Sequence, residues 1–334
     1  MEVRALVLAP FSSDALEALG HLLPVTYEPW TETRRLYDPQ ELAERINREQ
    51  VGILLVEADF LLAELFEAVT TLRLVGICRN SLEHVELAAA TRHGVPVVNA
   101  PSRNARAVAE LTVSLLLALA RSLIQAHAYV KGRHWEDPVG PYITMRGSEL
   151  QGKTLGIIGL GGVGREVAHL ARRLGMRVLA YDPYVGTPGS KKAGATLETL
   201  ETVLRQADFL SLHAPPTPET EGLLDARRLA LLKPGAYLVN TASAALVEQE
   251  ALVQALTSGH LAGAAMDVHE SHPLPPNSPL LELDNVILTP HLGGATHETV
   301  ERYSWMMVEA VRRFLGGRRP RHLANPAAWR RRAR

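Results

Sequence analysis

The chain of 334 residues is long enough for two domains of ordinary size. Hydrophobic residues make up 46% and charged residues 21%, a balance that is typical of a globular protein and excludes a disordered chain. The formal net charge of -1 gives no reason to expect nucleic acid or a membrane surface as the main partner. The single cysteine, Cys78, excludes an internal disulfide and a cysteine-rich metal site, and no metal site is predicted.

The first block of the chain alternates strands and helices. Short apolar runs at residues 4–9, 52–56, 74–78 and 95–99 predict buried strands, and amphipathic stretches at 14–22 and 39–48 predict helices. Strands that alternate with helices indicate a parallel sheet covered on both faces. A long helical stretch follows at residues 104–131. It is apolar nearly all round in its middle, so we expect it to be buried between domains or subunits.

Residues 132–148 contain several prolines and glycines and predict a loop, after which a second strand–helix series begins. Its strands are expected near 155–158, 177–181, 209–212, 237–240, 262–266 and 286–288. Its helices are expected near 163–174, 197–206, 225–231, 248–258 and 295–315. Two such series joined by a long helix predict two α/β domains.

The two ends of the chain bear on location and partners. The first residues include an acid and begin a strand-like run, so we expect no signal peptide. The longest apolar run, residues 111–120, is too short to span a bilayer, and we expect a cytoplasmic protein. Residues 312–334 hold nine arginines and no acidic residue. They predict a solvated, poorly ordered tail or, alternatively, an arm that binds anions or a protein.

The strongest motif is a glycine pattern, Gly159-x-Gly161-x-x-Gly164, placed directly after an apolar strand and before a helix. The first glycine allows a tight turn, the second lets the backbone approach a pyrophosphate, and the third lets the helix pack close to the strand. Asp182 ends the next strand, where a carboxylate accepts hydrogen bonds from the adenosine ribose and repels a 2′-phosphate. The motif therefore predicts NAD rather than NADP as the cofactor.

These motifs and several others resemble, in the same order, the D-isomer-specific 2-hydroxyacid dehydrogenases. The resemblance covers roughly residues 70 to 325, and beyond the glycine motif and Asp182 it is carried by Ser211-Leu212-His213-Ala214-Pro215, Asn240-Thr241-Ala242, Asp267-Val268 and Thr289-Pro290-His291-Leu292-Gly293-Gly294. It implies two doubly wound α/β domains: a flavodoxin-like substrate domain of residues 1–103 plus 296–334, and a Rossmann NAD-binding domain of residues 104–295. It also implies a hinge at the two crossovers and a homodimer built on the helix at 104–131.

The resemblance assigns three catalytic positions, of which two are substituted. His291 matches the family's acid–base histidine, and such catalysis requires a group that titrates near neutrality. The family arginine that clamps the substrate carboxylate is replaced by Ser243, and the glutamate that pairs with the histidine is replaced by His272. Ordinary 2-hydroxyacid dehydrogenase activity is therefore in question, although the fold is not.

Further residues are candidates for substrate and cofactor contacts. Arg79 and Asn80 follow a strand and are expected to face a small-molecule substrate, or Arg79 is a structural residue paired with Glu83 or Glu86. The resemblance implies that Asp267 holds the nicotinamide carboxamide and that His213 and Pro215 border the adenine. The remaining cofactor candidates are Gly162, Val163, Thr241, Ala242, Ser243, His291, Gly293 and Gly294.

Two functions fit these observations. The first is an NAD-dependent oxidoreductase that transfers hydride between the nicotinamide and a small hydroxy or keto acid at an altered site. The alternative is an NAD(H)-binding pseudoenzyme that acts as a sensor or scaffold. The intact cofactor motifs and His291 favour the first, and Ser243 and His272 favour the second.

Overall fold

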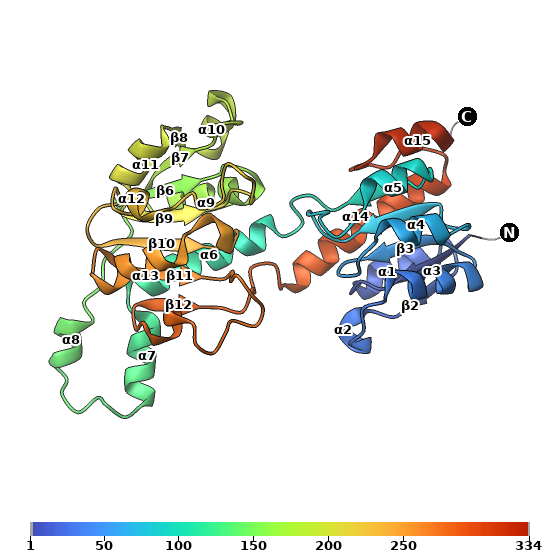
Figure 1. Cartoon of the computed structure of the whole chain (residues 1–334). Helices are drawn as coiled ribbons and strands as arrows, with labels where there is room; N and C mark the ends of the chain where they lie inside the picture. The colour runs from blue at the N-terminus through green and yellow to red at the C-terminus, as the bar shows by residue number, and fades with distance from the viewer. Residues whose placement is uncertain (1–2, 333–334) are drawn as a thin grey trace. The chain divides into compact units, whose positions relative to one another are not determined.

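The computed structural model describes residues 3–332, with side chains up to residue 330. The chain divides into two compact units, one of residues 1–103 and 296–334 and one of residues 104–295. Each unit is a parallel sheet covered by helices, as Figure 1 shows. The predicted fold class, two doubly wound α/β domains, is confirmed.

The first unit is built on a five-stranded parallel sheet in the order β2-β1-β3-β4-β5, which is the flavodoxin-like order. Its central strand β3 is buried along its whole length, because helices cover both of its faces. One face packs on α1 and α14 and the other on α3, α4 and α5. The strands are β1 (Arg4–Val7), β2 (Val25–Tyr27), β3 (Val51–Val56), β4 (Leu74–Ile77) and β5 (Val97–Asn99), and the helices are α1 (Ser13–Gly20), α2 (Trp30–Thr33), α3 (Pro39–Arg48), α4 (Ala63–Ala68), α5 (Leu87–Arg92), α14 (His297–Leu315) and α15 (Pro326–Arg332).

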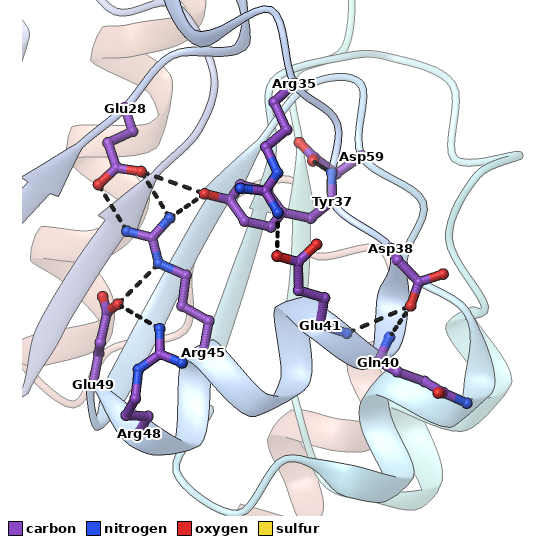
Figure 2. Close-up of polar contacts among 10 residues, drawn as sticks. All are labelled: Glu28, Arg35, Tyr37, Asp38, Gln40, Glu41, Arg45, Arg48, Glu49 and Asp59. Carbon is purple, nitrogen blue, oxygen red and sulfur yellow. Dashed lines mark hydrogen bonds and ion pairs between the residues drawn. The ribbon is translucent and has the colours of Figure 1, made fainter.

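A charged network fixes the loop between β2 and α3 (Figure 2). The guanidinium of Arg45, on α3, donates to both carboxylate oxygens of Glu28 (2.7 and 2.8 Å), to Glu49 (3.0 Å) and to the hydroxyl of Tyr37. The backbone amide of Tyr37 in turn donates to the buried carboxylate of Asp59 after β3 (3.1 Å). The network lines a polar surface depression. The ion pairs of Arg45 are formed within it, whereas Oδ2 of Asp59 is buried without a partner among the described residues.

The prediction of a poorly ordered arginine tail is wrong for the part of it that is described. Residue Asn325 is buried, accepts from the amide of Val97 (2.8 Å) and donates to the carbonyl of Val95 (2.9 Å). Ala328 is buried, and the ring of Trp329 lies 6.2 Å from that of Phe314. Apolar and amide side chains spaced between the arginines therefore attach this segment to the unit.

The second unit contains a seven-stranded parallel sheet in the order β12-β11-β10-β9-β6-β7-β8, as expected of a Rossmann domain. Two apolar clusters cover its two faces. The strands are β6 (Thr154–Ile158), β7 (Arg177–Tyr181), β8 (Thr196–Leu197), β9 (Phe209–Leu212), β10 (Ala236–Asn240), β11 (Leu261–Met266) and β12 (Val286–Leu288). The helices are α6 (Ala105–Ala120), α7 (Leu123–Lys131), α8 (Gly140–Thr144), α9 (Gly162–Arg173), α10 (Thr187–Ala193), α11 (Leu200–Gln206), α12 (Ala226–Leu229) and α13 (Gln249–Thr257), with short 3-10 turns η1 (Ala244–Leu246) and η2 (Pro279–Glu282).

The helical stretch at 104–131 is two helices rather than one. The helix is interrupted at Ser122, which has a left-handed φ of 47°. Helices α6 and α7 are bent relative to each other by 64°. Helix α6 is buried in its own unit against α9, β10 and β11, whereas α7 has no buried residue and projects with α8 from the unit (Figure 1). Within residues 3–332, no single helix is long and apolar enough to cross a membrane; α6 and α7 meet that criterion only when taken together.

Candidate active site

The carboxyl edge of the second unit's sheet gathers all the site residues predicted in that unit. The chain leaves β6, adds β7 and β8 on one side, and returns to place β9 on the other side of β6. This reversal is a topological switch point, where open α/β sheets bind their ligands. The predicted residues follow the ends of β6, β7, β9, β10, β11 and β12, and so they share one edge.

The glycine loop has the geometry that a dinucleotide requires. Gly159 has a φ of +92°, and a Cβ there would lie 2.6 Å from the backbone of His213. Only a glycine at this position therefore lets the loops that follow β6 and β9 pack against each other. A Cβ on Gly164 would lie 2.1 Å from the carbonyl oxygen of Gly159. At Gly161, by contrast, a Cβ would meet no described atom within 4 Å. This open space lies at the N-terminus of α9, whose first amides, those of Gly162 and Val163 included, face outward with the positive end of the helix dipole.

Asp182 is held in place at the end of β7. One carboxylate oxygen accepts from the amide of Leu160 (2.7 Å) and the other from the amide of Tyr184 (2.9 Å). The carboxylate is thus fixed beside the glycine loop and retains lone pairs for hydroxyl groups. This geometry suits a ribose with a free 2′-hydroxyl.

His213 carries an unsatisfied atom at the switch point. Its Nε2 lies 2.8 Å from the hydroxyl of Ser211, and its amide donates to Ile158 (2.7 Å), but its Nδ1 is buried without a partner among the described residues. Burial lowers the pKa of His213 to about 3, so the ring is neutral at physiological pH. Pro215 follows in the same loop, where its carbonyl accepts from Thr220. An orphaned polar atom and a glycine cradle on the same edge fit a bound dinucleotide.

The turn after β10 holds Ser243 through a buried amide. The side chain of Asn240 donates to the carbonyl of Ser243 (2.7 Å) and accepts from the amide of Ala242 (3.0 Å). The hydroxyl of Thr241 lies 3.0 Å from that of Thr112 on α6. Asn240 therefore shapes the turn, and Ser243 contributes no charge at the arginine position of the family.

Asp267 anchors the loop that carries His291. Its buried carboxylate accepts from the hydroxyl of Thr289 (2.6 Å) and from the amides of Leu292 (2.8 Å) and Gly293 (2.8 Å). A Cβ on Gly293 would lie 3.0 Å from this carboxylate, and one on Gly294 would lie 3.0 Å from the side-chain amide of Asn104. The sequence indicated a cofactor contact for Asp267; the structure shows that at least three of its acceptor positions serve the loop.

His291 and His272 are brought together. Nδ1 of His291 lies 3.2 Å from Nε2 of His272, and both side chains are exposed. His291 has a left-handed φ of 58°, which is uncommon outside glycine and is here imposed by the anchored loop. The register that placed His272 at the partner position of His291 thus corresponds to a direct contact.

In the first unit, Arg79 and Asn80 lie at the carboxyl edge of the sheet, just after β4, and both are exposed. No ion pair joins Arg79 to Glu83 or Glu86 in the described part of the chain, so the structural alternative for Arg79 lacks a contact. Asn80 accepts through its carbonyl from Asn99 (2.9 Å).

One cluster at the same edge of the first unit has no signature in the sequence. Glu57, directly after β3, accepts from Arg103 (2.9 Å) and from the indole of Trp30 (3.2 Å). The guanidinium of Arg103 also stacks 5.0 Å from the ring centre of Tyr303. Its partners are separated by tens to hundreds of residues, so no spacing in the sequence identifies it.

The fold and this edge define a dinucleotide-binding protein of two α/β units. The family model for the NAD-binding domain of D-isomer specific 2-hydroxyacid dehydrogenases matches residues 113–293, and the chain belongs to that family. Its NAD-binding domain is therefore established, and NAD is the cofactor that this domain takes.

The chain is similar to known proteins of this family. It is 41% identical over 254 residues to D-3-phosphoglycerate dehydrogenase of Bacillus subtilis, covering 76% of this chain and 47% of the relative. It is 39% identical over 263 residues to glyoxylate reductase of Korarchaeum cryptofilum, covering 79% of each. The crystal structure of TT0316 protein from Thermus thermophilus superposes with a TM-score of 0.84 at 36% identity, covering 96% of this chain and all of that one. The chain spans about half the length of the phosphoglycerate dehydrogenases that it matches.

Proposed function

We propose that the chain is an NAD-dependent oxidoreductase that interconverts a small 2-hydroxy acid and its 2-keto acid. The observation that carries the proposal is that one strand edge holds both a dinucleotide cradle and an anchored histidine, His291. Relatives with the names of dehydrogenases and reductases favour this function over the pseudoenzyme alternative, for which they offer no support. We assign substrate binding to the first unit, 1–103 plus 296–334, and NAD binding to residues 104–295.

Each part of the site has its own task. The bound nicotinamide supplies or accepts the hydride. Gly161 and the N-terminus of α9 hold the pyrophosphate, Asp182 holds the adenosine ribose, and His213 turns its buried Nδ1 toward the cofactor. His291 gives a proton to the keto oxygen during reduction and removes it from the hydroxyl during oxidation. Arg79 and Asn80 are exposed at the edge of the first unit and are assigned to the substrate's polar groups.

Steady-state oxidation of NADH with pyruvate, glyoxylate and hydroxypyruvate tests this proposal, with His291→Asn as the inactive control. Turnover of none of them by a folded protein that binds NADH would refute it. The cofactor assignment is tested separately by fluorescence titration of NADH and NADPH. NADH is expected to bind more tightly, and Asp182→Ala is expected to narrow the difference, because the carboxylate that repels a 2′-phosphate is gone.

We further propose a cytoplasmic homodimer. The apolar surface for it lies on the segment that projects from the second unit, from α7 to α8 (residues 123–144), which we call the arm. It does not lie on α6, whose buried side chains pack within their own unit. Large apolar side chains on the arm are about half or more exposed, among them Leu123 (58%), Trp135 (60%), Tyr142 (74%) and Ile143 (60%). Apolar side chains gathered on one arm fit the two-fold contact of a second copy. Light scattering is expected to show a dimer, and Ile143→Asp a monomer; a monomeric wild type at micromolar concentration would refute the assignment.

A further inference from the structure

Three neighbouring strands of the first unit bring one acidic and two basic side chains to a single edge of the sheet. Strands β3 and β4 are paired up to their last residues, so Glu57 and Arg79 follow adjacent strand ends. Arg103 comes from the segment after β5, the next strand of the sheet. The amide of Ala100 in that segment donates to the carbonyl of Arg79 (2.9 Å), so the loops after β4 and β5 are joined directly.

The acidic side chain and one of the basic side chains neutralise each other. Glu57 and Arg103 form an ion pair at 2.9 Å, in which 16% and 12% of the two side chains are exposed. The other oxygen of Glu57 accepts from the indole of Trp30 (3.2 Å), and the guanidinium of Arg103 lies against the ring of Tyr303. The guanidinium of Arg302, on α14, donates to the carbonyl of Arg103. The pair is thus fixed in place and largely removed from water, so solvent screens its charges only weakly.

Of the arginines on the loops after β3, β4 and β5, Arg79 is the one without an ion pair in the described part of the chain. Burial, and then the positive charge of Arg79, lower the pKa of the neighbouring His84, so this ring is neutral at physiological pH and adds no second cation. The carboxylates of Glu83 and Glu86 on the same loop are exposed, where water and salt screen them. These loops therefore offer an anionic ligand one unpaired cation and, at the next strand end, a fixed carboxylate.

We propose that Glu57 is a specificity-determining residue that restricts the substrate to 2-keto and 2-hydroxy acids with a single negative charge, an inference that rests on the proposed function. Arg79 matches the one carboxylate of such an acid. A second anionic group, a phosphate above all, would have to leave water for the guanidinium of Arg103, which Glu57 already holds. It would also meet the like charge of Glu57. The rest of a preferred substrate is therefore uncharged.

Hydroxypyruvate and phosphohydroxypyruvate test this inference, because they differ only in the phosphate. In steady-state oxidation of NADH at pH 7.5, kcat/KM of the wild type is expected to be about 100-fold higher for hydroxypyruvate. Glu57→Gln is isosteric, so it leaves discrimination by size unchanged while it removes the negative charge and frees Arg103. This variant is expected to raise kcat/KM for the phosphorylated acid by about tenfold or more, and to change that for hydroxypyruvate by less than about threefold.

Three matched variants separate charge from local damage. Glu57→Asp keeps the charge and is expected to keep the wild-type ratio of the two kcat/KM values. Glu83→Gln removes the same charge from an exposed position on the loop of Arg79, and the wild-type ratio is expected there too. Glu57→Gln combined with Arg103→Gln removes both charges of the pair and is expected to bring the ratio back toward that of the wild type. Retained turnover of hydroxypyruvate reports that the first unit of each variant is folded.

The possible failures of this inference and of the proposed function are distinguishable. A wild type that reduces phosphohydroxypyruvate as efficiently as hydroxypyruvate would overturn this inference alone. So would a ratio that Glu57→Gln leaves unchanged or that Glu83→Gln changes equally. A folded protein that binds NADH but reduces neither acid would instead overturn the proposed function.

Discussion

Replacing Asp267 with Asn distinguishes between two roles for this carboxylate: anchoring the loop that carries His291, and binding the nicotinamide carboxamide. An asparagine keeps one acceptor oxygen, which can serve Thr289 and Leu292, but its NH2 group then faces the amide of Gly293. The amide of Gly293 is then a buried donor without an acceptor, which costs about 2 kcal/mol of free energy. The hydrogen bonds from Thr289 and Leu292 no longer go to a charged acceptor, which costs about 1 kcal/mol each. The loop that presents His291 is therefore expected to lose roughly 3–4 kcal/mol of its preference for the observed conformation.

The consequence is expected in kcat rather than in cofactor affinity. If the lost loop energy is fully expressed in the reaction, kcat for a keto acid falls by about 100-fold or more, while the dissociation constant of NADH changes by less than about twofold. Asp208→Asn is the matched control, because that carboxylate accepts from the amide of Thr154 and from Lys233 at the opposite edge of the sheet. A variant of Asp267 with weakened NADH binding and an intact kcat would refute the anchoring argument and favour the contact with the carboxamide.

Three further predictions concern the altered site and the first unit. Ser243→Arg combined with His272→Glu is expected to raise kcat/KM on small keto acids by more than the two single changes predict together, because cation and carboxylate act on one transition state; steady-state kinetics of the four proteins decides this. Asn325→Ala is expected to destabilise the first unit by about 2–4 kcal/mol in urea unfolding, since it leaves two buried backbone groups of the β5 segment unpaired, whereas the exposed Arg330→Ala has little effect. Hydrogen bonds from Arg45 hold the pKa of Glu28 below its ordinary value, so the stability advantage of the wild type over Glu28→Gln is expected above about pH 4.3 and is lost as the pH falls through the lowered pKa.

Strand ends could be predicted from the sequence because buried parallel strands are short apolar runs that stop where polar residues begin. This pattern predicted β7, β9 and β12 to the residue, and with them the edge on which Asp182, His213 and His291 lie. The short strand β2 escaped notice, since its three half-buried residues form no distinct apolar run. The pattern predicts one long helix because apolar residues resume at Leu123, directly after Arg121 and Ser122, and two polar residues do not distinguish a helix break from a polar helix face.

The partners of the charged side chains at strand ends could not be predicted from the sequence, because they depend on contacts between segments that are distant along the chain. Arg79 and Glu57 both follow strands of the first sheet, yet Glu57 is occupied by Arg103 and Trp30 while Arg79 is exposed. A charged side chain at a strand end is therefore available to a ligand only where no other segment of the chain already forms a contact with it.

The same principle governs the contact between His291 and His272. The sequence placed His272 at a position defined by resemblance, but whether an imidazole there reaches His291 depends on the loop that Asp267 holds, 24 residues away from the histidine that it positions. Because the carboxylate binds backbone amides rather than the ring, it fixes the position of His291 through the loop. Asp267 is therefore expected to act through the position of His291, and a substitution there is expected to lower kcat even though its carboxylate binds neither ring of the pair.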